Sequence, residues 1–248
     1  MERRIVGLDG AEALKFLQGL VTNDVLRLEK GPGLIWTALL TPQGKYLADF
    51  FVGRDGAGLF LDLPEALAEG VLRRLTLYRL RADVRFVPRA GGVVRGIGAA
   101  PEGALEDPRH DAMGWRFYGS GQEAPVDWDA LRVAHLIPET GIELIPEESY
   151  PLELGFERLH GVDFRKGCYV GQEVTARMKH KTELKKGLVR VALEAPVPVG
   201  TLLMAGGKEA GSVYTQSGGR GLAWVRFDRA LGDMEADGVR VRQDTDFS

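Results

Sequence analysis

The sequence predicts an α+β region followed by a small C-terminal β-barrel. Between residues 9 and 88, apolar residues at helical spacing alternate with short apolar runs, which is the order of an α+β domain. From residue 187 onward, apolar residues recur with a period of two between glycine-rich breaks, as is typical of a small barrel or sandwich. The predicted divisions are an α+β domain at 1–88, completed by 126–180, a Gly- and Pro-rich second domain or insertion at 89–125, and the barrel at 185–248.

The first half of the chain predicts a helix, a hairpin, a strand, a helix and a strand in that order. Asp9 followed by Glu12 has the form of a capping box and predicts a short amphipathic helix over residues 10–20. The residues Thr41-Pro42-Gln43-Gly44 predict the hairpin turn, because proline suits its second position and glycine its last. The other elements are hairpin strands at 34–40 and 46–52, a strand at 59–63, a helix after Pro64 with an apolar stripe of Leu67, Val71, Leu75 and Tyr78, and a strand at 84–87.

The second half begins less clearly and then becomes regular. The segment from Pro88 to Pro125 fits either a small loop-rich domain or a linker with a hairpin. Asp127 is expected to cap a helix that carries Trp128 and ends before Pro138. Barrel strands are predicted at 188–193, 201–204, 211–214, 222–227 and 239–242.

Composition places the chain among ordinary globular proteins of a reducing compartment. It is 44% hydrophobic and 27% charged, and its single cysteine excludes a disulfide framework. No apolar run approaches the ~20 residues of a membrane span, and the charged first residues do not fit a signal peptide. A net charge of −3 argues against general nucleic-acid binding. We therefore expect a cytoplasmic protein without membrane contact.

Basic residues gather between Arg165 and Arg190. This segment holds eight basic and two acidic residues, a local excess of six positive charges, so the rest of the chain carries about −9. Such a run forms either a solvated face or an anion site beside the cysteine.

The single cysteine, Cys168, lies between two glycines in Lys166-Gly167-Cys168-Tyr169-Val170-Gly171-Gln172-Glu173. Fixed positive charge beside a cysteine favours the thiolate, which is the nucleophilic and metal-binding form, and Arg165 and Lys166 are the nearest such charges in the sequence. The alternative is a small buried hydrophobic residue. No metal site is predicted: the four histidines lack paired-ligand spacing, and one cysteine cannot hold an iron–sulfur cluster without ligands from a partner.

Asp49 is the second candidate. On an alternating strand its carboxylate shares a face with Leu47 and Phe51, where an unpaired charge would be costly. It is therefore either a hydrogen-bond acceptor for a nearby loop or arginine, or a functional group.

Residues 161–178 resemble the signature of the YgfZ family, folate-binding relatives of the glycine-cleavage T-protein that are implicated in maintaining iron–sulfur enzymes. Residues 16–19 with 22–25 (Phe-Leu-Gln-Gly and Thr-Asn-Asp-Val) resemble the family's amino-terminal motif, and residues 41–44 its first hairpin. The resemblance covers nearly the whole chain and is weakest in the middle.

The resemblance implies a site. Cys168 becomes the reactive group, and Asp49 resembles the T-protein aspartate beside the reactive folate nitrogen, although Ala48 stands where the T-protein has a second acidic residue. Trp128 resembles the tryptophan that stacks on the pterin, whereas Arg3 stands where relatives have another aromatic residue. The other residues expected to bind the cofactor are Tyr169, Gln172, Glu153, Lys166 and Arg177.

The leading hypothesis is a protein that binds tetrahydrofolate, or a one-carbon-substituted folate, and supports assembly or repair of iron–sulfur enzymes through Cys168. Its partners would be iron–sulfur client or assembly proteins. One alternative is a folate-dependent aminomethyl- or methyltransferase with Asp49 as the acid–base group. The other is a non-catalytic docking factor whose basic stretch binds an acidic partner.

Overall fold

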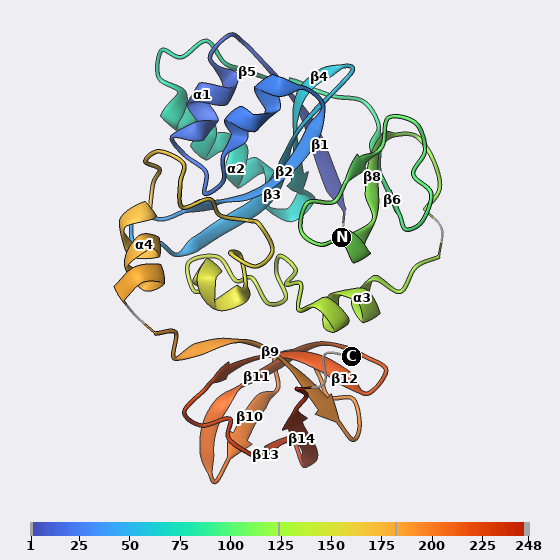
Figure 1. Ribbon diagram of the computed structural model, residues 1–248, viewed down its shortest axis with the longest axis vertical. Helices are drawn as coiled ribbons and strands as arrows, with labels where there is room; N and C mark the ends of the chain where they lie inside the picture. The colour runs from blue at the N-terminus through green and yellow to red at the C-terminus, as the bar shows by residue number, and fades with distance from the viewer. Residues whose placement is uncertain (1, 124, 182, 246–248) are drawn as a thin grey trace. The chain divides into compact units, whose positions relative to one another are not determined.

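The computed structural model describes residues 2–123, 125–181 and 183–245 (Figure 1). It divides into two compact units. The first comprises Met1–Val126 and Glu157–Val174, and the second comprises Asp127–Phe156 and Thr175–Ser248. The last of the three boundaries along the chain falls inside helix α4 (Gln172–Lys181).

The first unit is built on a five-stranded antiparallel sheet in the order β2-β3-β4-β1-β5. Its strands are β1 (Arg3–Asp9), β2 (Gly33–Leu40), β3 (Tyr46–Asp55), β4 (Gly58–Pro64) and β5 (Arg85–Pro88). Two helices, α1 (Ala13–Gln18) and α2 (Glu65–Arg79), and the 3-10 helix η1 (Val25–Lys30) accompany the sheet. Leu17, Phe50, Leu61 and Leu75 are fully buried in one core cluster, so the helices and the sheet share a single apolar interior.

A smaller sheet completes the first unit. It has the order β6-β8-β7 and is formed by β6 (Gly92–Gly96), β7 (Leu105–Glu106) and β8 (Trp115–Gly119), with the 3-10 helix η2 (Asp111–Met113) between the last two. Arg116 of β8 joins the two sheets: its Nη1 lies 3.1 Å from Asp62 of β4, and its Nε lies 2.9 Å from Asp107. Tyr118 donates a further hydrogen bond of 2.9 Å to Asp62.

The second unit contains a closed barrel in the order β10-β11-β12-β9-β14-β13, which confirms the predicted fold class. The barrel strands are β9 (Lys186–Leu193), β10 (Leu202–Ala205), β11 (Lys208–Ser217), β12 (Arg220–Arg226), β13 (Asp233–Ala236) and β14 (Val239–Gln243). Alternate residues point inward, as Val189, Val191 and Leu193 do on β9, and form the barrel core. Helix α3 (Trp128–His135) and the 3-10 helix η3 (Pro151–Leu154) precede the barrel.

The predicted turn and cap both form. Gly44 donates its backbone N–H to Thr41 at 2.9 Å, and Ala130 donates to the side chain of Asp127 at 2.8 Å. The predicted capping box does not form. Helix α1 begins at Ala13, and the Glu12 carboxylate instead accepts the backbone N–H of Asp83, because β5 approaches here.

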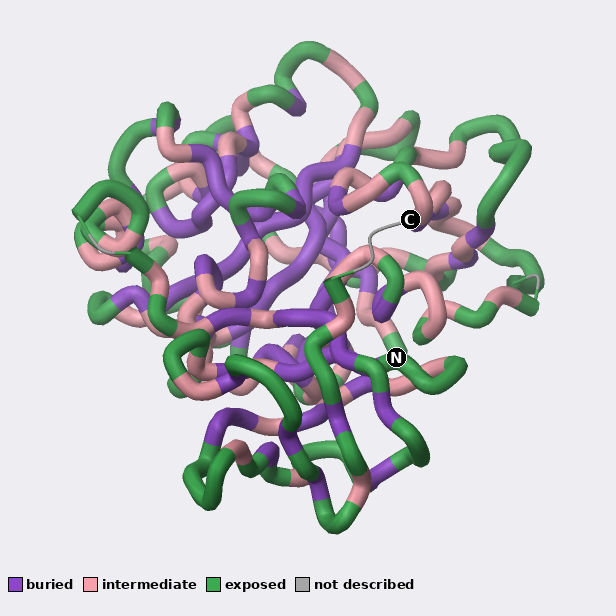
Figure 2. Tube along the Cα trace, turned by 60° about the horizontal axis from the view of Figure 1, so that its bottom comes forward, coloured by how far each residue is buried: buried purple, intermediate pink, exposed green. Residues whose placement is uncertain are grey.

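Strands β1, β7 and β13 were not predicted. Figure 2 shows the buried, intermediate and exposed stretches along the chain, with exposed residues at the outer loops. None of the helices described is both long enough and apolar enough to cross a bilayer.

Candidate functional site

Cys168 is exposed in the loop that leads into α4. Exposure changes from residue to residue along this loop: Lys166 and Tyr169 are buried, whereas Gly167 and Cys168 are exposed. The thiol therefore faces outward from a segment held at both sides. The alternative of a small buried residue does not hold for Cys168.

Lys166 fastens the loop to the amino-terminal part of the first unit. Its ammonium group donates to the backbone carbonyl of Gln18 at 2.7 Å and to that of Val21, and it lies 4.8 Å from the centre of the Tyr169 ring. Burial lowers the pKa of Lys166 to about 8, against the opposing effect of Asp24 and Asp163. The sequence predicts that Lys166 supplies charge to the thiol. Its hydrogen bonds go to the backbone instead, because a buried ammonium group needs acceptors.

Asp163 and Arg165 precede the cysteine. The Asp163 carboxylate accepts the backbone N–H of Arg165 at 2.7 Å and pairs with the guanidinium of Arg27. The Arg165 side chain is almost fully exposed, and its Nε is 3.8 Å from Asp163. An ion pair at this distance with a solvent-exposed arginine contributes little stability.

Two glycines explain how the loop packs on the first hairpin. Gly171 has a φ of +86°, and a Cβ there would lie 2.6 Å from the Thr41 carbonyl oxygen. Gly44, with a φ of +75°, would place a Cβ 2.9 Å from the Cβ of Val174. Both positions therefore need glycine for conformation and for space. Gly167 differs, because a Cβ there would meet nothing within 4 Å.

The amino-terminal motif meets the cysteine segment through buried hydrogen bonds. The Thr22 hydroxyl donates to the Gly161 carbonyl at 2.7 Å, and the Asn23 amide donates to the His160 carbonyl at 2.6 Å. The Asp163 backbone N–H donates to the Thr22 carbonyl at 3.1 Å. Segments about 140 residues apart in the sequence are thus joined a few residues before Cys168.

Asp49 is buried on β3, and both of its oxygens accept hydrogen bonds. The Trp36 indole N–H donates to Oδ2 and the Tyr46 hydroxyl donates to Oδ1, each at 2.7 Å. These two donors are side chains of strands β2 and β3, and neither belongs to a loop or to an arginine. A carboxylate held by two neutral donors on both oxygens is fixed in orientation.

A buried ion network lies next to Asp49 and was not found from the sequence. Arg109 pairs with Asp107 at 2.8 Å and lies 6.0 Å from the centre of the Trp36 ring. Burial would raise the pKa of the Asp107 carboxyl, but Arg109 and Arg116 hold it well below its usual range. Arg3, which according to the resemblance stands in place of an aromatic residue, pairs with Asp62 at 2.5 Å in the same network. Asp62 and Arg116 are 54 residues apart, so only the fold brings them together.

In the second unit, Trp128 is the first residue of α3 and is half-buried. Helix α3 is anchored to the barrel by Arg132, which donates to Glu143 at 2.7 Å and to the Thr215 hydroxyl at 2.9 Å. Glu143 in turn accepts the Thr215 backbone N–H at 3.1 Å and its hydroxyl at 2.6 Å.

Glu153 also belongs to the second unit and accepts the Trp224 indole N–H at 3.0 Å. Burial raises the pKa of Glu153, although Trp224 and Lys186 act to lower it. The Lys186 ammonium group lies 4.8 Å from the centre of the Trp224 ring. Arg177 is exposed on α4. The predicted set therefore divides, with Asp49, Lys166, Cys168, Tyr169 and Gln172 in the first unit and Trp128, Glu153 and Arg177 in the second.

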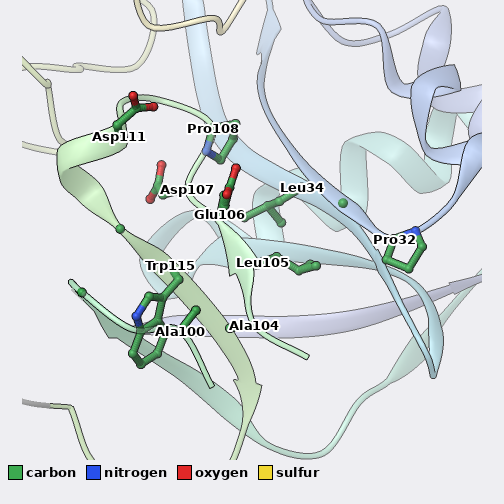
Figure 3. A pocket seen from close by; sticks show the side chains of 13 residues that line it. Pro32, Leu34, Ala100, Ala104, Leu105, Glu106, Asp107, Pro108, Asp111 and Trp115 are labelled. Carbon is green, nitrogen blue, oxygen red and sulfur yellow. The ribbon is translucent and has the colours of Figure 1, made fainter. Parts of the chain in front are cut away.

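The first unit also holds a cavity of about 920 Å³, drawn in Figure 3. Its walls come from the start of β2, the loop after β6, and the segment from β7 to β8. The lining includes the apolar Leu34, Leu105 and Trp115 and the acidic Glu106 and Asp111. The predicted site residues are not among those that line it.

The fold matches that of a solved aminomethyltransferase. The structure of the glycine cleavage system aminomethyltransferase T from Bartonella henselae superposes with a TM-score of 0.76 at 14% identity, covering 99% of this chain and 84% of that one. Residues 185–245 match the family model of the CAF17 C-terminal β-barrel domain. These comparisons confirm an α+β region followed by a C-terminal barrel.

The named relatives are iron–sulfur cluster assembly factors. The chain is 30% identical to the iron–sulfur cluster assembly factor IBA57 homologue of Mycosarcoma maydis over 75% of this chain and 54% of that protein. It is 29% identical to human IBA57 over 96% of this chain and 80% of that protein. The chain spans about half the length of the first curated relatives it matches.

These names contradict the expected cytoplasmic location. Both relatives are named mitochondrial proteins and point to mitochondria. A low cysteine count indicates reducing conditions, which are not confined to one compartment, so composition could not decide the location.

Proposed function

We propose that this protein supports assembly or repair of iron–sulfur proteins, with the Cys168 thiol as its reactive group. The observation that carries the proposal is the contrast within the cysteine loop. Lys166 and Gly171 fix the loop to the first unit, whereas Cys168 between them is exposed. The names of the relatives support the same process. A fixed loop presents the sulfur at low entropic cost to a partner.

The chemistry of one thiol limits what it does. A thiolate is a soft ligand for iron, but a cluster needs about four ligands. The described chain has its only cysteine at position 168. The cluster is therefore substrate or cargo on this proposal, and a client or assembly protein supplies the remaining ligands.

The proposal includes tetrahydrofolate, or a one-carbon-substituted folate, as the cofactor. Trp128 and Gln172 are half-buried, so each keeps surface that a flat ring or its polar edge can contact. Lys166 contacts the Tyr169 ring, and Glu153 accepts a hydrogen bond from Trp224. These three residues therefore suit support of the site more than direct contact with the folate. The folate would supply a one-carbon carrier. Equilibrium binding of tetrahydrofolate should weaken at least about tenfold on Trp128→Ala, and unchanged affinity would remove folate from the proposal.

The test of the main proposal is replacement of Cys168 by alanine in a cell that lacks the native protein, scored by the activities of its iron–sulfur enzymes. We expect activities close to those of the deletion strain. The matched control is Lys30→Gln, at an exposed residue of the first unit that lies outside the cysteine loop, which should retain activity. Full activity of Cys168→Ala would sink the proposal.

The aminomethyltransferase alternative is favoured by one observation, the fixed carboxylate of Asp49 within this fold. It predicts turnover of a one-carbon unit by the purified protein. Under it, Asp49→Asn lowers that turnover far more than Cys168→Ser. Our proposal predicts the opposite order for iron–sulfur enzyme activity, so the two variants separate the hypotheses.

A further inference from the structure

Helix α2 ends in an exposed apolar group. Leu77 and Leu80 are 73% and 87% exposed, and Tyr78 is 41% exposed. The sequence predicts that the apolar stripe of this helix continues to Tyr78, but the stripe ends at Leu75, which is fully buried. Leucines this exposed lose the stabilisation that burial would give, so their position needs another explanation.

The turn that follows the helix is held in place. Leu80 has a φ of +48°, a conformation that is unfavourable for a leucine. The Arg79 carbonyl accepts the Ala82 N–H at 2.9 Å. The Asp83 carboxylate accepts the Ala11 N–H at 3.1 Å, and the Asp83 N–H donates to Glu12 at 2.9 Å. Val84 is buried just beyond. The exposed leucine is therefore presented on a fixed backbone.

The same segment is strongly basic in an acidic protein. Residues 73–85 contain five arginines and one aspartate, a net charge of +4. Because the whole chain has a net charge of −3, the rest of it carries −7. Arg73, Arg81 and Arg85 are exposed. The ion pairs of Arg73 with Glu69 and of Arg85 with Asp83 lie at the surface and compete weakly with a partner.

We propose that this surface, which we call the α2 terminus (Arg73, Arg74, Leu77, Tyr78, Leu80 and Arg81), docks on a protein partner whose carboxylates surround an apolar pocket. Arginine and tyrosine are enriched among residues that dominate binding energy. The planar guanidinium group binds carboxylates with two parallel hydrogen bonds. The fixed turn means that Leu80 enters the pocket without losing backbone freedom.

A protein fits this surface better than a membrane or a nucleic acid. Two leucines and a tyrosine bury less apolar surface than one myristoyl chain, which itself gives only marginal membrane binding. Phosphate binding would use the arginines but would leave Leu77 and Leu80 in water. An acidic protein face with an apolar pocket engages both the arginines and the leucines.

The experiment is photo-crosslinking in living cells from a benzophenone amino acid at position 80, compared with the same probe at Leu231, which is 84% exposed on the barrel unit. Mass spectrometry identifies the crosslinked peptide. We expect position 80 to crosslink a protein segment with net negative charge, at a yield at least about tenfold above that of position 231. The double variant Arg74→Glu/Arg81→Glu should lower this yield at least about tenfold.

The matched charge control is Lys30→Glu/Lys208→Glu, two exposed lysines that do not belong to the α2 terminus, which should leave the yield unchanged. Circular dichroism melting checks that each variant is folded, and the single variant Arg81→Glu is used if the double variant is not. Crosslinks to lipid, to a second copy of this chain or to a segment without net negative charge would overturn the proposal. So would a yield no higher than at position 231, or one that charge reversal does not change.

Discussion

At the scale of single residues, neighbours in sequence serve different purposes in the cysteine loop. Lys166 binds backbone carbonyls, Gly171 permits close packing, and Cys168 is exposed. The sequence placed charge beside the thiol, but it could not show where the lysine side chain turns. That direction depends on Gln18 and Val21, which lie about 145 residues earlier.

Lys166 should give stability a specific pH dependence. Its pKa in the folded protein, about 8, lies below the ordinary value of 10.5, so between these values the unfolded chain binds more protons. The free energy of unfolding contributed by this group therefore rises with pH from about 8 to about 10.5. Lys166→Met should remove that rise. Urea unfolding of both proteins between pH 7 and pH 10.5 checks this, and identical pH profiles would contradict it.

Gly171 and Gly167 should respond differently to alanine. Gly171→Ala strains a backbone with positive φ and brings the new Cβ against the Thr41 carbonyl, so we expect a loss of about 2 kcal/mol or more in the free energy of unfolding. Gly167→Ala meets open space and should stay within about 0.5 kcal/mol of the native protein. Urea denaturation gives both values. Equal losses would show that the loop does not pack as described.

At the scale of elements, regular patterns were predicted well and charged strands were not. The hairpin of β2 and β3 has clear apolar runs and a proline–glycine turn. Strand β1 begins with two arginines, and β13 is four residues long with two carboxylates, so neither shows a clean apolar period. Strand β1 is recognisable only once β4 and β5 pair with both of its edges.

The joint between α3 and the barrel gives a prediction at this scale. Glu143 is buried and accepts from Arg132 and Thr215. Glu143→Gln removes the only fully buried carboxylate among the described ion-pair partners of Arg132 and leaves Asp129 at 2.9 Å and Glu139 at 3.4 Å, which are more exposed. The change should cost about 3 kcal/mol of unfolding free energy. The exposed Glu148→Gln is the control and should change little. Guanidinium denaturation measures both, and a small effect of Glu143→Gln would mean that other contacts hold α3.

At the scale of the whole molecule, the class of fold followed from periodicity, and the candidate site followed only in part. The resemblance drew attention to Cys168 and Asp49, and the structure shows one exposed and the other fixed by Trp36 and Tyr46. The sequence could not predict the ion network of Asp62, Asp107, Arg109 and Arg116, because its members come from segments without a shared sequence pattern.

The rate at which iodoacetamide alkylates Cys168 in the native protein, relative to the same protein unfolded in urea, tests most directly whether the loop presents its sulfur to a partner. With the thiol exposed, the native rate should lie within about tenfold of the unfolded rate, and Gly171→Ala should alter it by loosening the loop. A native protein whose thiol reacts only after unfolding would contradict the account.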